Sequence, residues 1–195
     1  RRAQALFERA LAGARGAPTW DWRVSLAYAQ LEAEQPEQAL ATLDELEFDI
    51  RLARVASLDP LRDSGADEWL ERLRVIRANF ERFTSQPQAA GARLARVLDE
   101  IPFDLDARAA MNALQRDRGE PRRALAGARR LWLDFPDSPW AGMPVAEALI
   151  DLGDYGAARD TLDTLRARHG DLPALGRLDT QLARRRAGVA RLSLS

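Results

Sequence analysis

The chain has 195 residues and a formal net charge of −1, and all 29 of its basic side chains are arginine. The balance of charge argues against binding of nucleic acid through bulk positive charge. There is no cysteine, which excludes disulfides, cysteine nucleophiles and thiolate metal sites. The absence of lysine excludes Schiff-base chemistry, and a single histidine, His169, argues against a His-rich metal site or a Ser-His-Asp triad.

With 46% hydrophobic and 30% charged residues, the composition is that of a folded domain rather than a disordered segment. No apolar run approaches the length needed to cross a membrane. The sequence starts at Arg1, within a segment that has helical periodicity. We therefore expect the chain to be a piece of a longer protein, so that missing targeting signals say nothing about location.

An internal repeat of 34 residues organises the chain. The spacing separates the members of three sets, which are Ala90/Ala124/Ala158, Pro102/Pro136 and Gly119/Gly153. The same interval relates Ala39 to Ala5. A glycine, an alanine five residues later and a proline twelve residues after that are typical of the tetratricopeptide repeat.

Each such unit holds two antiparallel helices, and the repeated alanine lies where they cross, so that the backbones approach closely. Apolar residues of the second helices recur at helical spacing, as in Ala124, Ala128 and Leu131. One pair cannot bury this apolar stripe, whereas stacked pairs form a continuous core. The predicted fold is all-α, a tetratricopeptide-repeat right-handed superhelix, or α-solenoid, of antiparallel helix pairs.

The predicted layout begins with a partial repeat at 1–18, of which Ala3–Ala14 is a second helix. A full unit at 19–54 follows, with helices Asp21–Glu34 and Glu37–Leu46. Residues 55–70 are interpreted as an inserted loop, rich in Pro, Ser and Gly, in which Asp67 caps the next helix. Units are expected at 71–104, 105–138 and 139–172, and a capping helix at 173–188. Alternation of apolar and polar residues predicts a strand at 189–195, a possible start of a β-rich domain.

In tetratricopeptide arrays, the first helix of each unit lines a concave groove. The repeat register assigns to this groove Asp21, Tyr28, Glu32, Arg72, Asn79, Arg82, Asp106, Arg116, Asp117, Trp140, Glu147 and Asp151. The groove would be mixed in charge and more acidic toward its C-terminal half. For each residue the alternative is an ordinary solvated surface.

The tryptophans divide into two groups. Trp132 lies among leucines of a second helix and is expected in the core, and Trp69 is expected to pack against the preceding loop. Trp20, Trp22 and Trp140 lie at the starts of first helices, where one ring face stays exposed. An exposed ring beside a carboxylate suits a sugar or a cationic ligand.

No arrangement of residues predicts catalysis. His169 ends a helix, where it serves as a C-terminal cap. The carboxylate pairs Asp104/Asp106 and Asp134/Asp137 lie at helix starts and turns, where Asp is the expected N-cap. The sequence has no phosphate-binding glycine loop and no metal-ligand cluster. We expect a protein that is not an enzyme and that needs no metal or cofactor.

A closer resemblance lies in the C-terminal half. Its motifs are the junction Phe103–Arg108 after Pro102, the turn Gln115–Ala124, the segments Ala146–Leu149 and Leu152–Ala158, and Asp67–Leu70 before a helix. This run resembles the periplasmic tetratricopeptide domain of bacterial poly-β-1,6-N-acetylglucosamine export porins, over about Thr19 to Ser195. Glu120 replaces an aromatic residue usual in that family.

The resemblance implies a periplasmic domain of an outer-membrane protein that serves biofilm matrix secretion. The domain would bind partially deacetylated poly-β-1,6-N-acetylglucosamine and the periplasmic deacetylase, and guide the polymer to the barrel. Because freed amines make the polymer cationic, Asp106, Asp117, Glu147 and Asp151 would attract it. Trp140 and Tyr155 would stack on sugar faces.

Two other functions remain open on the sequence. One is a generic scaffold for protein–protein interaction, with a peptide docked in the concave groove. The absence of lysine argues against the chaperone type of peptide-carboxylate clamp. The other is a helical accessory domain of a cell-wall lytic enzyme.

Overall fold

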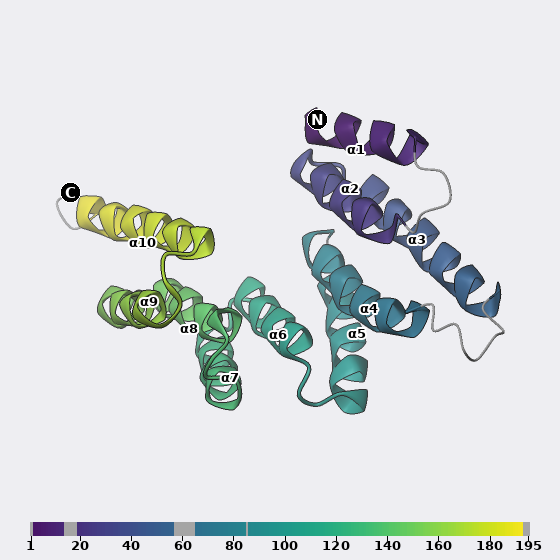
Figure 1. The fold of residues 1–195 in the computed structure, drawn as a ribbon. Helices are drawn as coiled ribbons and strands as arrows, with labels where there is room; N and C mark the ends of the chain where they lie inside the picture. The colour runs from purple at the N-terminus through teal and green to yellow at the C-terminus, as the bar shows by residue number, and fades with distance from the viewer. Residues whose placement is uncertain (1, 14–18, 57–64, 85, 193–195) are drawn as a thin grey trace. The chain divides into compact units, whose positions relative to one another are not determined.

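A computed structural model describes residues 2–13, 19–56, 65–84 and 86–192, and all regular secondary structure in these ranges is helical (Figure 1). The helices divide into two compact units, Arg1–Asp99 and Glu100–Ser195. Their bounds are α1 (Arg2–Gly13), α2 (Trp20–Glu32), α3 (Pro36–Ala56), α4 (Ala66–Phe83), α5 (Pro87–Glu100), α6 (Leu105–Asp117), α7 (Pro121–Asp134), α8 (Pro139–Leu152), α9 (Tyr155–His169) and α10 (Pro173–Leu192).

In the first unit, α2 packs on both α1 and α3, and α3 packs on α4. The core is formed by side chains that α2, α3 and α4 turn inward, including Leu43, Leu46, Ile50 and Phe80, each fully buried. Trp20 and Trp69 extend this core with an edge-to-face contact, their ring centroids 5.7 Å apart. Trp69 therefore packs on the first helix of the preceding pair, a partner that the sequence did not indicate.

In the second unit, each helix from α6 to α10 packs on the next one along the chain, and α8 also contacts α6 and α10. This pattern puts the first helices of successive pairs side by side, as in stacked helix pairs. The core is aliphatic and includes Leu131, Ile150, Leu162, Leu165 and Leu175. Trp132 is half-buried against it rather than enclosed within it.

Four of the five repeated alanines are fully buried as the repeat predicts, whereas Ala5 of α1 is exposed, so the prediction is wrong for that residue. Ala39, Ala90, Ala124 and Ala158 are all 0% exposed. At another close approach, a Cβ added to Gly142 of α8 would lie 2.5 Å from the Leu165 side chain and 3.1 Å from the Trp132 indole. A side chain at that point would require the Leu165 side chain to shift.

Two predicted boundaries in the first unit are wrong. The second helix was expected over Glu37–Leu46, but α3 continues to Ala56. Neither proline nor glycine occurs between 37 and 59, so nothing local ends the helix. The inserted loop predicted at 55–70 is accordingly shorter at both ends, because α4 begins at Ala66; residues 57–64 lie outside the described ranges.

The expected cap of α4 is also wrong. The N-cap is Gly65, in the left-handed conformation, and Asp67 lies in the first turn, where its carboxylate pairs with Arg54 at 2.9 Å. By contrast, Asp104 caps α6 as expected and accepts a hydrogen bond of 2.7 Å from the Ala107 N–H. Asp134 is the last residue of α7 and pairs with Arg108 at 2.8 Å instead of capping a helix.

The predicted strand at the C-terminus is wrong for 189–192, which continue α10; residues 193–195 lie outside the described ranges. The alternation of apolar and polar residues there is short. Alanine, arginine and leucine all favour a helix, and no proline interrupts the chain after Pro173.

Candidate functional site

Three of the predicted groove residues meet in the second unit. Arg116, near the end of α6, is bonded through Nε to the Asp151 carboxylate at 2.6 Å and through a terminal nitrogen to Glu147. The side chains of Arg116, Glu147 and Asp151 are 17%, 31% and 21% exposed. The two carboxylates of α8 are therefore already neutralised in part by a guanidinium group, and they are not free acidic groups.

Arg116 and Asp151 of this triad also line a hollow of about 460 Å³. The hollow lies between the ends of α6 and α8 and the middle of α10, and is lined by Arg116, Asp117, Asp151, Gln181 and Arg185, with Gly119 and Pro121. Gln181 and Arg185 were not predicted, because the repeat register stopped before α10. The signal for them was the composition of 173–192, with five arginines and one aspartate.

The other groove residues of this unit lie apart from the triad. Asp106 is exposed at the start of α6, with no ion pair to any described residue. Trp140 is exposed at the start of α8, with 58% of its surface accessible, as the sequence indicated. Both lie at the first turn of their helices, whereas Arg116 and Asp151 lie in the last turns of α6 and α8.

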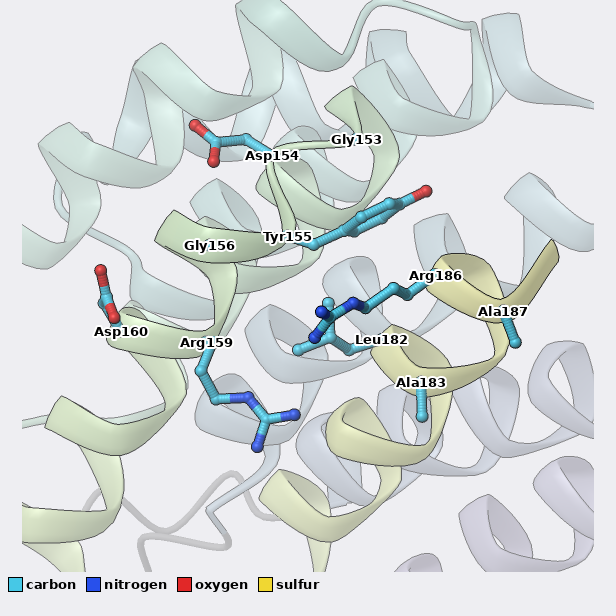
Figure 2. Close-up of a pocket in the computed structure, with 10 residues that line it drawn as sticks. All are labelled: Gly153, Asp154, Tyr155, Gly156, Arg159, Asp160, Leu182, Ala183, Arg186 and Ala187. Atoms are coloured by element: carbon cyan, nitrogen blue, oxygen red, sulfur yellow. The ribbon is translucent and has the colours of Figure 1, made fainter. Parts of the chain in front are cut away.

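Tyr155 lines a different hollow, of about 800 Å³, between α9 and α10 (Figure 2). Its ring is half-buried against the core. Figure 2 shows the guanidinium group of Arg186 next to the ring and that of Arg159 farther from it, while the carboxylate of Asp154 lies on the side away from α10. Asp154 is the N-cap of α9 and accepts a hydrogen bond of 3.1 Å from the Ala157 N–H.

In the first unit, the predicted residues form two small groups. Arg72 lies over the Trp69 ring, 4.9 Å from its centroid, and 3.8 Å from the Asp21 carboxylate. Arg82 donates a hydrogen bond of 3.0 Å to Asn79. Two further residues lie outside these groups: Tyr28 packs on Phe80 with ring centroids 4.8 Å apart, and Glu32 is exposed.

The most buried carboxylate of the first unit was not predicted. Glu81 is 3% exposed and accepts hydrogen bonds from Arg93 at 2.8 Å and from Arg77 at 3.3 Å. Burial lowers the pKa of Arg77, but its bonds with Asp44 and Glu81 raise it by more, so this pKa lies above the usual arginine value. The stability that the charged Arg77 adds to the fold is fully present when the pH is below the usual arginine pKa. It is lost only as the pH rises through the raised pKa of Arg77.

Within the described ranges, no group of three or more His, Cys, Asp or Glu side chains is placed to hold a metal ion. The predicted C-terminal cap at His169 is wrong: His169 is the last residue of α9, the C-cap is Gly170, and the buried His169 Nε2 has no hydrogen-bond partner among the described residues. No helix among the described residues is long and apolar enough to span a membrane.

A family model described as tetratricopeptide repeat matches residues 115–182, from the end of α6 into α10. The match contains the whole of α7, α8 and α9 and the first half of α10. No curated protein sequence matches the chain.

Two solved structures share this architecture. A tetratricopeptide repeat protein from Parabacteroides merdae is 15% identical, with a TM-score of 0.51 over 88% of this chain and 62% of that one. A single-residue variant of the nearly identical tetratricopeptide-like repeats of a Podospora anserina putative kinesin light chain is 18% identical, with a TM-score of 0.50 over 85% and 84%. The chain has the tetratricopeptide-repeat fold. At these identities the likeness concerns the fold alone, and the chain spans less than two thirds of the Parabacteroides protein.

Proposed function

We propose that this chain is a non-catalytic interaction domain that holds a partner against the first helices of its repeats. The observation that carries the proposal is the Arg116–Glu147–Asp151 triad beside its hollow. Long polar side chains from two helices are fixed there in one geometry by charge-assisted hydrogen bonds. Such a preorganised polar surface favours binding, because less side-chain entropy is lost when a partner docks.

We propose further that the partner is partially deacetylated poly-β-1,6-N-acetylglucosamine, together with the periplasmic deacetylase, in the periplasmic part of an exopolysaccharide export porin. The support is the sequence resemblance and the exposed aromatic rings of the first helices. Trp22, Tyr28 and Trp140 are 45%, 44% and 58% exposed, and such rings suit the apolar faces of sugars.

The structure changes how this polymer would be held. Glu147 and Asp151 are bonded to Arg116, so they have less charge to offer a polymer amine than the sequence suggested. Asp106 has no such partner among the described residues and remains a candidate contact. In the proposed complex, ring stacking contributes more than ionic attraction, and many weak contacts along one polymer add up to the affinity.

The test is a tryptophan-fluorescence titration with partially deacetylated and fully acetylated β-1,6-glucosamine oligomers. We expect Trp140→Ala to weaken binding about three- to tenfold, the range of one aromatic contact. Leu133→Ala is the matched control, since Leu133 is 75% exposed on a second helix, α7. We expect a smaller loss for Asp106→Asn, visible only with the deacetylated oligomer and reduced by salt. No response to either oligomer would refute polymer binding and leave the fold unaffected.

A second candidate function is a scaffold that docks a peptide. It is favoured by the mixed donors and acceptors around the hollow of Arg116, Asp117 and Gln181, which match the needs of a peptide backbone. The test is to select ten-residue peptides that bind the chain from a library. Peptides that no longer bind the variant Arg116→Ala/Asp151→Ala would support this function. Selected peptides that bind the variant equally well would exclude this hollow as the docking site.

A further inference from the structure

One face of α10 presents arginines that form no ion pair with any residue that the structure describes. Arg177, Arg184 and Arg185, with Thr180 and Gln181, line a hollow of about 620 Å³; these five residues are called the arginine stripe below. Positions 177, 180/181 and 184 are three or four residues apart, so they lie on one side of the helix. All are exposed except Gln181, which is half-buried.

Within the part of the chain that the structure describes, no ion pair neutralises the arginines of the stripe. The α10 sequence has five arginines against one aspartate, Asp179. That aspartate is bonded to Arg166 of α9. Among the described residues, no carboxylate pairs with Arg177, Arg184 or Arg185. An exposed set of guanidinium groups without counter-charge attracts carboxylates, which it binds in bidentate fashion.

We propose that the arginine stripe docks an extended acidic segment of a partner polypeptide. Arg177 and Arg184 are seven positions apart, which corresponds to a rise of about 10 Å along the helix. Three residues of an extended chain span about the same distance, so carboxylates three positions apart would meet both guanidinium groups. The Thr180 hydroxyl donates its hydrogen bond to the Gly176 carbonyl at 3.0 Å, so its oxygen offers an acceptor to the intervening peptide groups, and the Gln181 amide offers them both a donor and an acceptor.

The surroundings of the stripe favour a polypeptide over other anionic partners. A helix that binds a membrane surface needs large apolar side chains beside its cations, and residues 173–188 expose none. A nucleic-acid surface adds aromatic rings on which bases stack, and no aromatic residue lines this hollow. An acidic peptide needs neither feature.

The stripe also connects to the groove face. Gln181 and Arg185 line both its hollow and the one that contains Arg116 and Asp151. A bound segment that leaves the stripe would therefore continue toward the ion-paired triad. This inference goes beyond the proposed function, since a cationic polymer would be repelled by the same arginines.

The experiment measures fluorescence anisotropy of a labelled nine-residue Gly/Ser peptide with Glu at positions 1, 4 and 7, titrated with the 195-residue chain. A peptide with Gln at these positions and one with three adjacent Glu residues serve as comparisons. We expect the spaced Glu peptide to bind best, more weakly as salt rises, and the Gln peptide not to bind. Arg177→Gln/Arg184→Gln should weaken binding about tenfold, as for the loss of two charge pairs.

The matched control is Arg122→Gln/Arg129→Gln, which removes two exposed arginines at the same spacing on α7. Equal losses from both double variants would overturn the proposal, because binding would then reflect net charge alone. Tighter binding of anionic lipid vesicles or of oligothymidine than of the spaced peptide would overturn it in favour of a membrane or a nucleic acid. Circular dichroism melts verify that each variant folds. Titration of Arg177→Gln/Arg184→Gln with glucosamine oligomers tests the polymer proposal separately.

Discussion

The helix pairs α2–α3 and α8–α9 follow the same repeat pattern, but they differ at the two positions where the pattern ends a helix. Five residues before the crossing alanine, the second pair has Gly153 with φ +78°, whereas the first has Glu34 with φ +61°. Twelve residues after that alanine, the second pair has Gly170, where α9 stops, and the first has Arg51, through which α3 continues.

The difference separates two contributions to the fold. Ala39 and Ala158 are both fully buried, so each pair encloses its repeated alanine. By contrast, the turn before the alanine and the end of the helix after it depend on single residues. Packing therefore maintains the helix pair even where the local residues do not favour its turns, as with a glutamate in the left-handed region.

The largest effect is expected at the crossings. Ala39→Leu and Ala158→Leu each force a larger side chain into a fully buried position, at an expected cost of about 3 kcal/mol in the free energy of unfolding. Urea denaturation followed by circular dichroism measures it, with Ala41→Leu on the exposed face of α3 as control. If only one of the two variants were destabilised, the crossings would not be equivalent.

The next effect distinguishes the pairs at their first helices. Gly142→Ala places a Cβ 2.5 Å from Leu165 and should cost about 2 kcal/mol through displaced packing. The corresponding residue of the first pair, Arg23, is partly exposed and pairs with Asp49 at 2.6 Å, so Arg23→Ala should cost only about 0.5 kcal/mol. Thermal melts of both variants test this order. Similar costs would show that α2 and α8 are equally enclosed.

The residue with positive φ in the turn can be tested in both pairs, by introducing a glycine in the first pair and by removing the glycine of the second. Glu34→Gly should stabilise the chain by about 0.5–1 kcal/mol, because glycine adopts a positive φ without steric strain. Gly153→Ala should destabilise it by about 1 kcal/mol, and by conformation alone, since an added Cβ there meets nothing within 4 Å. The midpoints of urea denaturation of both variants test these expectations. A loss of stability with Glu34→Gly would show that the glutamate side chain contributes a contact.

The smallest effect concerns the end of α3. Arg51→Gly introduces the glycine that ends α9 and should cost about 1 kcal/mol, with faster amide exchange confined to 52–56. Arg51→Ala is the control, because it removes the ion pair with Glu47 at 2.7 Å but retains helix propensity. Hydrogen exchange read by mass spectrometry locates the change. Unaltered protection at 52–56 would mean that packing, and not the missing stop residue, extends α3.

Sequence alone determined the features that depend on neighbours along the chain. The 34-residue spacing located the turn glycines and four of the five repeated alanines as buried, and the preference of Asp for helix N-caps located the Asp104 cap, because turns and caps are set by a few adjacent residues. The same reasoning failed at α3 and at 189–192, where no stop residue occurs and the helix simply continues.

Only the tertiary structure decided which charges meet. Arg116 lies 31 residues from Glu147 and 35 from Asp151, and no local pattern joins them. Glu81 bonds to Arg93 across two helices, and α10 brings Gln181 and Arg185 to the hollow beside Arg116. Periodicity tells which face of a helix is buried, but the partner of a long polar side chain depends on which helices stack and in what register.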